Sequence, residues 1–191
     1  MMKILGIVCS PRLHGNTEIM VQEALTKAQG EGAEIELITL AGKTLSPCDG
    51  CRSCHKTGKC HVKDDMQDIY PKLLEADGII FGTPVYFWNV SAQAKALIDR
   101  TYVFSPRRKL RNKVAGVVVT TERSGSTNAV AVFNSFFTIQ KMLMVGRAIG
   151  FSGEEGYSDK EAVKKDKQGM AQAAALGEAV VKFIQFHKIP G

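Results

Sequence analysis

The chain has 191 residues, of which 45% are hydrophobic, and a net charge of +6, so we expect residues 1–191 to form one well-buried domain. The basic runs Arg107–Lys113 and Lys164–Lys167 are not interleaved with aromatic residues, which argues against nucleic-acid binding. Such runs are usually solvated surface, and a minority bind an acidic partner or a phosphate. The apolar stretch Ile4–Cys9 is too short for a signal peptide and no later stretch could span a membrane, so we expect a cytoplasmic protein without membrane contact.

Apolar runs alternate with segments of helical periodicity along the chain. Continuous apolar runs of strand length are typical of strands buried on both faces of a parallel sheet. The expected strands are Lys3–Cys9, Glu34–Leu40, Gly78–Thr83, Lys113–Thr121 and Met144–Phe151. The expected helices run through Met20–Ala28, Met66–Leu74, Ser91–Ile98, Asn128–Leu143 and Lys165–Phe186. With right-handed crossovers, this alternation predicts an open, doubly wound α/β fold with helices on both faces of the sheet.

One expected helix is apolar around nearly its whole circumference. Its apolar residues are Val130, Val132, Phe133, Phe136, Phe137, Ile139, Met142 and Leu143. A surface helix of this kind would expose a large apolar area, so we infer that its outer face meets another subunit.

Three polar loops are expected at one edge of the sheet, because ligands of such folds bind at the carboxyl ends of the strands. These loops are Ser10–Thr17, Thr83–Asn89 and Thr120–Ser126. The first loop combines hydroxyl, amide and guanidinium groups with backbone N–H groups at a helix start, which suits a phosphate monoester. It contains neither Gly-Lys-Ser/Thr nor Gly-x-Gly-x-x-Gly, which argues against a P-loop hydrolase and a Rossmann dinucleotide site.

Cys9, directly before this loop, could in principle be the nucleophile of a phosphatase. That chemistry needs an arginine to clamp the phosphoryl oxygens, as in the Cys-x5-Arg arrangement of low-molecular-weight tyrosine phosphatases. Here the corresponding position is Gly15 rather than arginine. We therefore favour a buried, inert cysteine.

The second loop carries three successive aromatic residues, Tyr86, Phe87 and Trp88. A planar ligand can stack on such side chains while backbone N–H groups bond the edge of its ring. The competing interpretation is that each aromatic side chain only packs the loop onto the core.

A cysteine-rich loop over residues 46–62 follows the second expected strand. It holds four of the five cysteines, at Cys48, Cys51, Cys54 and Cys60. Four thiolates from one compact loop suit a cubane iron–sulfur cluster, and Gly50 and Gly58 allow the backbone to turn. Tetrahedral zinc and metal-free thiols are the alternatives, since spacing indicates ligand type and count but not the metal.

Taken together, several segments resemble the iron-sulfur flavoproteins of the flavodoxin-like, NADPH-dependent FMN reductase superfamily. The resemblance rests on Ser10–Thr17, Cys48–Cys60, Lys63–Met66, Glu75–Ile80, Thr83–Tyr86 and Ser91–Arg100. It implies a flavodoxin-like sheet of five parallel strands in the order 2-1-3-4-5. It also implies non-covalently bound FMN, a [4Fe-4S] cluster, and a homodimer or homotetramer.

The resemblance also implies roles for individual residues. The FMN phosphate would be held by Ser10, Arg12, Asn16 and Thr17. The isoalloxazine would be lined by Pro84, Val85, Tyr86, Phe87 and Trp88, and closed on its other side by Thr120, Arg123, Ser124 and Gly125. The cluster ligands would be Cys48, Cys51, Cys54 and Cys60.

These features predict an electron-transfer flavoprotein, in which FMN and the cluster pass electrons between a one-electron donor such as a ferredoxin-like protein and an acceptor. One alternative is an NAD(P)H-dependent FMN or quinone reductase without a cluster, in which the cysteine loop is only a lid. Another is a zinc-stabilised or metal-free flavin-binding module that is not an enzyme. For the electron-transfer flavoprotein, no catalytic acid, base or nucleophile is expected from the side chains.

Overall fold

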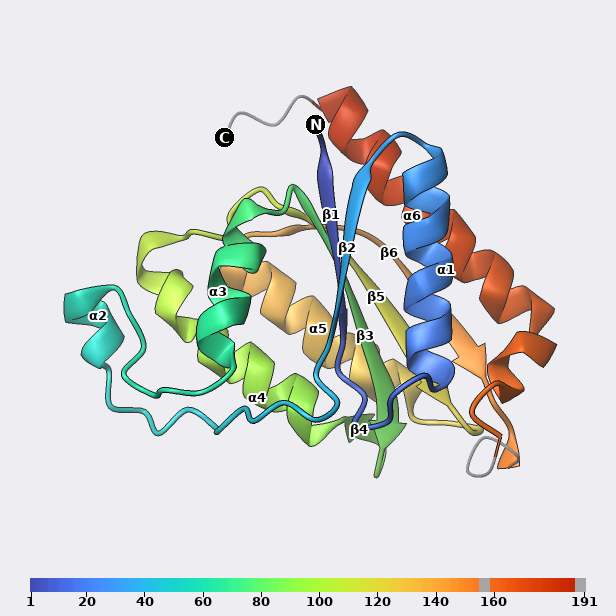
Figure 1. Cartoon of the computed structure of the whole chain (residues 1–191), viewed down its shortest axis with the longest axis horizontal. Coiled ribbons are helices and arrows are strands. Elements are labelled where there is room, and N and C mark those ends of the chain that lie inside the picture. The colour runs from blue at the N-terminus through green and yellow to red at the C-terminus, as the bar shows by residue number, and fades with distance from the viewer. Residues whose placement is uncertain (155–158, 188–191) are drawn as a thin grey trace.

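The computed structural model describes residues 1–154 and 159–187, and its centre is a sheet of five parallel strands (Figure 1). These strands are β1 (Lys3–Val8), β2 (Glu34–Thr39), β3 (Gly78–Tyr86), β5 (Val114–Thr121) and β6 (Leu143–Phe151). Their order is β2-β1-β3-β5-β6, which confirms the predicted order 2-1-3-4-5. Strand β3 continues to Tyr86 instead of ending at Thr83, because its last residues pair antiparallel with the short strand β4 (Asn89–Val90).

Helices cover both faces of the sheet (Figure 1). On one face lie α1 (Asn16–Gly30) and α6 (Lys167–His187); on the other lie α3 (Met66–Glu75), α4 (Ala92–Arg100) and α5 (Ser126–Gln140). The side chains of β1 alternate between the two layers: Leu5 and Ile7 join the core beneath α3, α4 and α5, whereas Ile4 and Val8 join the core beneath α1 and α6. None of the helices in the described ranges is long and apolar enough to cross a bilayer.

The structure removes the reason for inferring a subunit contact on the outer face of α5, because most of the large apolar side chains of this helix are buried. Val130, Phe133, Phe136 and Phe137 are buried, and the four-ring cluster of Phe81 with the last three accounts for much of the apolar content of this helix. The helix ends at Gln140 and Leu143 already belongs to β6, so fewer apolar residues share the helix than the pattern suggested. Of its large apolar side chains only Ile139 is clearly exposed, at 70%.

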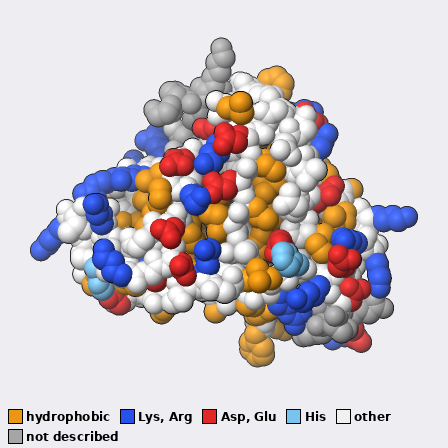
Figure 2. Space-filling view, in the orientation of Figure 1, with side chains coloured by type: hydrophobic (Ala, Val, Ile, Leu, Met, Phe, Trp, Pro, Cys, Tyr) orange, Lys and Arg blue, Asp and Glu red, His pale blue; other side chains and the backbone are white. Residues whose placement is uncertain are grey.

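Two short elements that the sequence did not reveal lie in or beside the cysteine loop. Helix α2 (Ser53–Thr57) lies inside the cysteine loop, and the 3-10 helix η1 (Thr101–Arg107) continues directly from α4. Arg52 before α2 and Gly58 after it both have left-handed backbone conformations, with φ of 58° and 73°, so the chain reverses sharply at each end. Lys and Arg side chains gather over this end of the molecule (Figure 2).

Helix α1 packs directly against glycine positions of the sheet and of α6. A Cβ atom at Gly6 would lie 2.7 Å from Leu25 Cδ1, and one at Gly82 would lie 2.4 Å from Val21 Cγ2. On the opposite side, a Cβ atom at Gly177 of α6 would lie 1.9 Å from the Ala24 carbonyl oxygen. The position of α1, whose first turn follows the Ser10–Thr17 loop, is therefore fixed from both sides.

We predict that Gly177→Ala destabilises the fold, because the added methyl group meets a backbone atom that cannot rotate away. Overpacking of this kind typically costs about 1–3 kcal/mol of unfolding free energy, measurable by urea denaturation. Gly30→Ala is the matched control: it lies in the last turn of α1 with open space around the new Cβ, so it should raise stability by about 0.5–1 kcal/mol. Equal unfolding midpoints for Gly177→Ala and the wild type would contradict the close packing of α1 and α6.

Candidate functional site

A pocket of about 660 Å³ lies at the carboxyl ends of β1, β3, β5 and β6. Twelve of the thirteen residues expected to bind FMN line it, and Gly125 does not. The pocket is also lined by residues that the sequence did not single out: Gly15, Thr121, Glu122, Ser152, Gly153 and Lys160. Ser152 and Gly153 follow the fifth parallel strand, so the rule that ligands bind at carboxyl strand ends could have identified them.

The loop after β1 forms an anion-binding end of the pocket. Helix α1 has no side-chain cap, and its first backbone hydrogen bond runs from Ile19 N to Gly15 O, so the N–H groups of its first turn remain available to a ligand. The hydroxyl groups of Thr17 and Thr120 are 2.6 Å apart and both residues are nearly fully buried. Ser10 Oγ accepts a hydrogen bond of 3.1 Å from Arg12 N, which shapes the loop.

The side chain of Asn16 is already engaged with a distant segment. Its Oδ1 accepts a hydrogen bond of 2.8 Å from Val163 N, and its Nδ2 donates one of 3.4 Å to Asp159 O. These bonds join the start of α1 to the segment before α6 and help to form the pocket wall that includes Lys160. A contribution of Asn16 to anion binding would therefore come from its backbone N–H.

The aromatic loop after β3 is a tight two-residue hairpin. Tyr86 pairs with Asn89, and the two residues between them, Phe87 and Trp88, have φ of 44° and 66°. Such hairpin turns require positive φ at both central positions and usually contain Asn or Gly, so two large side chains here are held at a cost of about 1–2 kcal/mol each. Phe87 is fully exposed and Trp88 is 60% exposed, so these rings do not pack onto the core.

Gly125 has a supporting role instead of lining the pocket. It precedes α5 with φ of 87°, and a Cβ atom there would lie 2.8 Å from Val85 Cγ1 and 3.1 Å from Trp88 Cα. The absence of a side chain thus lets the third loop approach the hairpin. In that third loop, Thr121 Oγ1 donates a hydrogen bond of 2.5 Å to Ser124 O, while Arg123 reaches Glu122 across 3.4 Å.

Cys9 is not part of this pocket. Its side chain is fully buried and burial raises the pKa of its thiol, so the reactive thiolate is strongly disfavoured. This agrees with an inert cysteine and removes the phosphatase interpretation, because phosphoryl transfer to cysteine needs an accessible thiolate.

The four loop cysteines line a second, smaller hollow of about 30 Å³. Cys48 and Cys51 are exposed, whereas Cys54 and Cys60 are half-buried against the core beneath α3 and α4. Burial raises the pKa of the Cys54 thiol, and the neighbouring Cys60, Cys48 and Cys51 contribute in the same direction. Thiolates that line one hollow repel one another, so a bound cation or cationic cluster core would stabilise their deprotonated forms.

Two histidines contact residues that line the hollow. His61 Nε2 is 2.8 Å from Asp49 Oδ2, and Asp49 Oδ1 accepts a hydrogen bond of 3.1 Å from Cys51 N. Asp49, Cys51 and His61 place ligand atoms within 4.8 Å of one another. His55 Nε2 instead lies 2.8 Å from Tyr102 Oη.

Arg100 fixes both ends of the cysteine loop. This residue is 2% exposed, and its guanidinium donates to Ser46 O at 2.8 Å, to Val62 O at 3.4 Å and to the Asp64 carboxylate at 2.6 Å. Burial alone would raise the pKa of Asp64, but the hydrogen bonds from Arg100 and from Ser46 N hold it below its ordinary value. Sequence reasoning did not predict this role, because no spacing relates Arg100 to residues 46–62.

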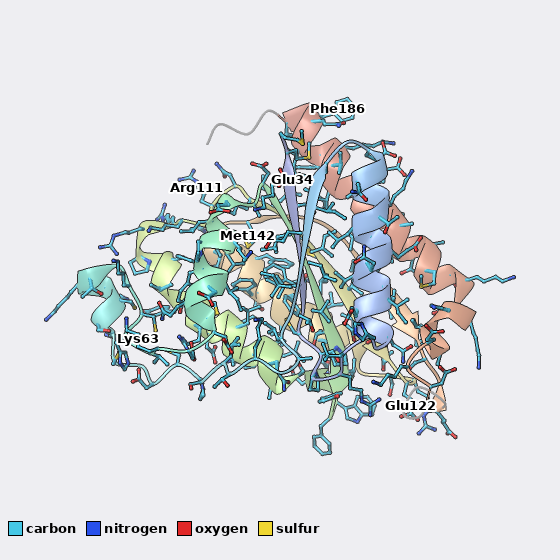
Figure 3. The ribbon with its side chains drawn as sticks, viewed as in Figure 1. Glu34, Lys63, Arg111, Glu122, Met142 and Phe186 are labelled. Carbon is cyan, nitrogen blue, oxygen red and sulfur yellow. The ribbon has the colours of Figure 1, made fainter. Side chains whose placement is uncertain are left out.

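The donors around the hollow fit an iron–sulfur cluster. Arg100 lines it, and Arg100 Nε is buried with no hydrogen-bond partner among the described residues, so a thiolate or sulfide acceptor would complete its bonding. The hollow and the larger pocket are separate: Figure 3 shows Lys63, at the cysteine loop, and Glu122, at the larger pocket, on different sides of the molecule.

Known proteins share both the sequence and the fold. Residues 2–156 match the family described as NADPH-dependent FMN reductase. An iron-sulfur flavoprotein of Methanocaldococcus jannaschii is 41% identical over 192 residues, covering 98% of this chain and 100% of that protein.

Two solved structures carry the same fold at low sequence identity. RosB, solved with bound 8-demethyl-8-formylriboflavin-5'-phosphate, has a TM-score of 0.71 at 16% identity, covering 99% of this chain and 82% of RosB. An archaeal flavodoxin has a TM-score of 0.57 at 14% identity, covering 96% of this chain and 99% of the flavodoxin. The fold is therefore flavodoxin-like, and the chain belongs to the iron-sulfur flavoproteins of the NADPH-dependent FMN reductase family.

Proposed function

We propose that this protein is an FMN- and iron-sulfur-dependent electron-transfer flavoprotein, passing electrons between a one-electron donor such as a ferredoxin-like protein and an acceptor. Membership of the family supports an FMN-dependent oxidoreductase with a flavin-based redox role. The observation that carries the finer proposal is the gathering of Cys48, Cys51, Cys54 and Cys60 around one hollow. When bound, FMN accepts electrons in pairs or singly and a [4Fe-4S] cluster exchanges one at a time.

The residues of the larger pocket would bind and orient FMN. The backbone N–H groups at the start of α1, the Thr17 and Ser10 hydroxyls and the Arg12 guanidinium suit its phosphate. The isoalloxazine would lie in the remaining space of the pocket. This space is lined by the strand end and hairpin Pro84–Trp88 and by the loop residues Thr120, Arg123 and Ser124. Gly125 would act indirectly, by allowing the hairpin to approach.

The residues of the smaller hollow would hold the cluster and tune its potential. The four thiolates would be its ligands, and the buried Arg100 guanidinium would stabilise its negative charge while it holds the loop ends at Ser46 and Val62. Reduced thiols of this kind persist in a reducing compartment such as the cytoplasm. We further propose a homodimer or homotetramer.

An NAD(P)H-dependent FMN or quinone reductase is the second candidate. Phe87 is fully exposed, Trp88 is 60% exposed and both line the pocket, so their rings could stack on a planar substrate that binds over the flavin. Rapid bleaching of the flavin by NADPH alone, in protein that lacks iron and sulfide, would favour this candidate.

We predict that Thr17→Val weakens FMN binding by about tenfold, because the variant loses a hydroxyl donor beside the phosphate and leaves Thr120 without its partner. Riboflavin lacks the phosphate, so its affinity should change much less. Quenching of flavin fluorescence on titration into apoprotein measures both affinities. Thr26→Val, an exposed position on the same helix, is the control and should bind FMN like the wild type. An equal loss for FMN and riboflavin would mean that Thr17 does not contact the phosphate.

We predict about four iron and four sulfide ions per subunit in protein prepared without oxygen. Cys60→Ala should lose most of both, because three thiolates do not complete the ligand set. Cys9→Ala is the matched control, since Cys9 is buried away from the hollow, and it should retain the full metal content. Elemental analysis with a visible spectrum measures the outcome. Stoichiometric zinc without iron, or flavin with neither metal, would overturn the cluster assignment.

A further inference from the structure

The positive charge of the protein is concentrated beside the cysteine hollow. Residues 50–63 and 100–113 contain ten of the 25 Lys and Arg residues and none of the 19 Asp and Glu residues. The rest of the chain therefore has 15 cationic and 19 acidic side chains, a net charge of −4. The overall basic character thus comes from these two segments, which we call the basic surface.

The two segments of the basic surface lie side by side. Arg107 Nη1 donates to Cys54 O at 3.5 Å, and the rings of His55 and Tyr102 lie 5.2 Å apart. Eight of the ten cations are exposed: Arg52, Lys56, Lys59, Lys63, Arg107, Arg108, Lys109 and Arg111. Figure 2 shows Lys and Arg side chains projecting at the α2 end, and Figure 3 labels Lys63 by the cysteine loop and Arg111 near the top of α3.

Carboxylates of the described residues do not neutralise these charges. Within residues 1–154 and 159–187, no salt bridge joins any of the eight exposed cations to a carboxylate. The nearest acidic residues in the sequence already have partners: Asp49 contacts His61, Asp64 contacts Arg100 and Asp99 contacts Lys95. Among the described residues the eight cations therefore have no carboxylate partner, and Arg52 and Arg107 bring part of this positive field next to the cysteine hollow.

We propose that the basic surface is the docking site for an acidic one-electron carrier protein, which binds over the exposed edge of the cysteine hollow. This deepens the proposed function and rests on it. A nucleotide fits this surface poorly for two reasons. The hollow, at about 30 Å³, is too small to hold it, and a single nucleotide could not contact cations that spread over α2, η1 and the chain that follows. Single-stranded nucleic acid fits less well, because Tyr102 is the one exposed Phe, Tyr or Trp residue of the basic surface and it already contacts His55 through its ring and its hydroxyl.

Charge reversal on the basic surface tests the proposal. Lys56→Glu/Lys109→Glu/Arg111→Glu changes three exposed cations and leaves out Arg107, which contacts the cysteine loop. The matched control, Arg147→Glu/Lys167→Glu/Lys182→Glu, makes the same change in net charge on β6 and α6. The probe is a small acidic [2Fe-2S] ferredoxin, and its affinity for the full-length protein is measured by calorimetry at increasing ionic strength.

At low ionic strength, reversal on the basic surface should weaken ferredoxin binding by about 30-fold or more, and the control by no more than about threefold. At about 0.5 M salt the difference should largely disappear, because the charges are exposed and screened. Equal losses for the two variants would overturn the proposal, since a general charge effect would then explain them. Tight binding of a single-stranded oligonucleotide in place of ferredoxin would also overturn it, in favour of a nucleic-acid surface.

Metal content and binding separate this inference from the proposed function. If wild-type protein binds ferredoxin in a salt-dependent way but contains no iron, the docking surface is supported and the assignment of a cluster is overturned. If ferredoxin reduces both cluster-loaded variants equally well, the proposed function is supported and the docking surface is overturned.

Discussion

The parallel pairing of β1 with β2 on one side and β3 on the other determines where everything else lies. Because Val8 pairs with Thr39 and with Gly82, the carboxyl ends of these strands finish at one edge. The loops that follow β1, β3 and β5 must then converge on one pocket. Their spacing also depends on glycine at contact positions, since Gly6, Gly82 and Gly177 let α1 sit close enough for Thr17 to reach Thr120.

The cysteine loop is inserted into this framework and is held by a different kind of interaction. The buried Arg100 guanidinium binds both ends of the loop and the Asp64 carboxylate, and removing either partner of such a pair typically costs several kcal/mol. Arg100 is the last residue of α4. Ser91 caps the other end of this helix, and its hydroxyl donates to Cys9 O at 2.5 Å, at the base of the first pocket loop. One nine-residue helix therefore connects the framework of the pocket to that of the cysteine loop.

The sequence was informative where a feature depends on local chemistry or periodicity. The five parallel strands and the three loops at the carboxyl edge were predictable from the residues, because most of these strands are apolar runs and the sheet rule places their ends together. The order of the strands was implied only by the resemblance to the family. The four cysteines could be grouped by spacing alone. Their metal could not be, because zinc and iron share the same ligands.

What the sequence did not reveal depends on contacts between distant segments. The engagement of Asn16 with Val163 spans 147 positions, and the clamp of Arg100 on Ser46 spans 54. The phenylalanines of α5 looked like an exposed apolar face until their packing around Phe81 was known. The hairpin places Phe87 and Trp88 at positive φ, where turns usually have Gly or Asn. Such departures from local propensity are common at functional sites.

The burial of Cys9 separates the five cysteines into two chemically distinct classes. An alkylating reagent applied to the folded apoprotein meets the four loop thiols, whereas Cys9 becomes available only when the sheet opens. Cys9, which is labelled only after denaturation, therefore serves as an internal standard for the number of loop thiols labelled before it. Any thiol of the loop that is occupied by a metal is missing from the first count, so chemical labelling alone can report what fraction of the molecules carry a centre.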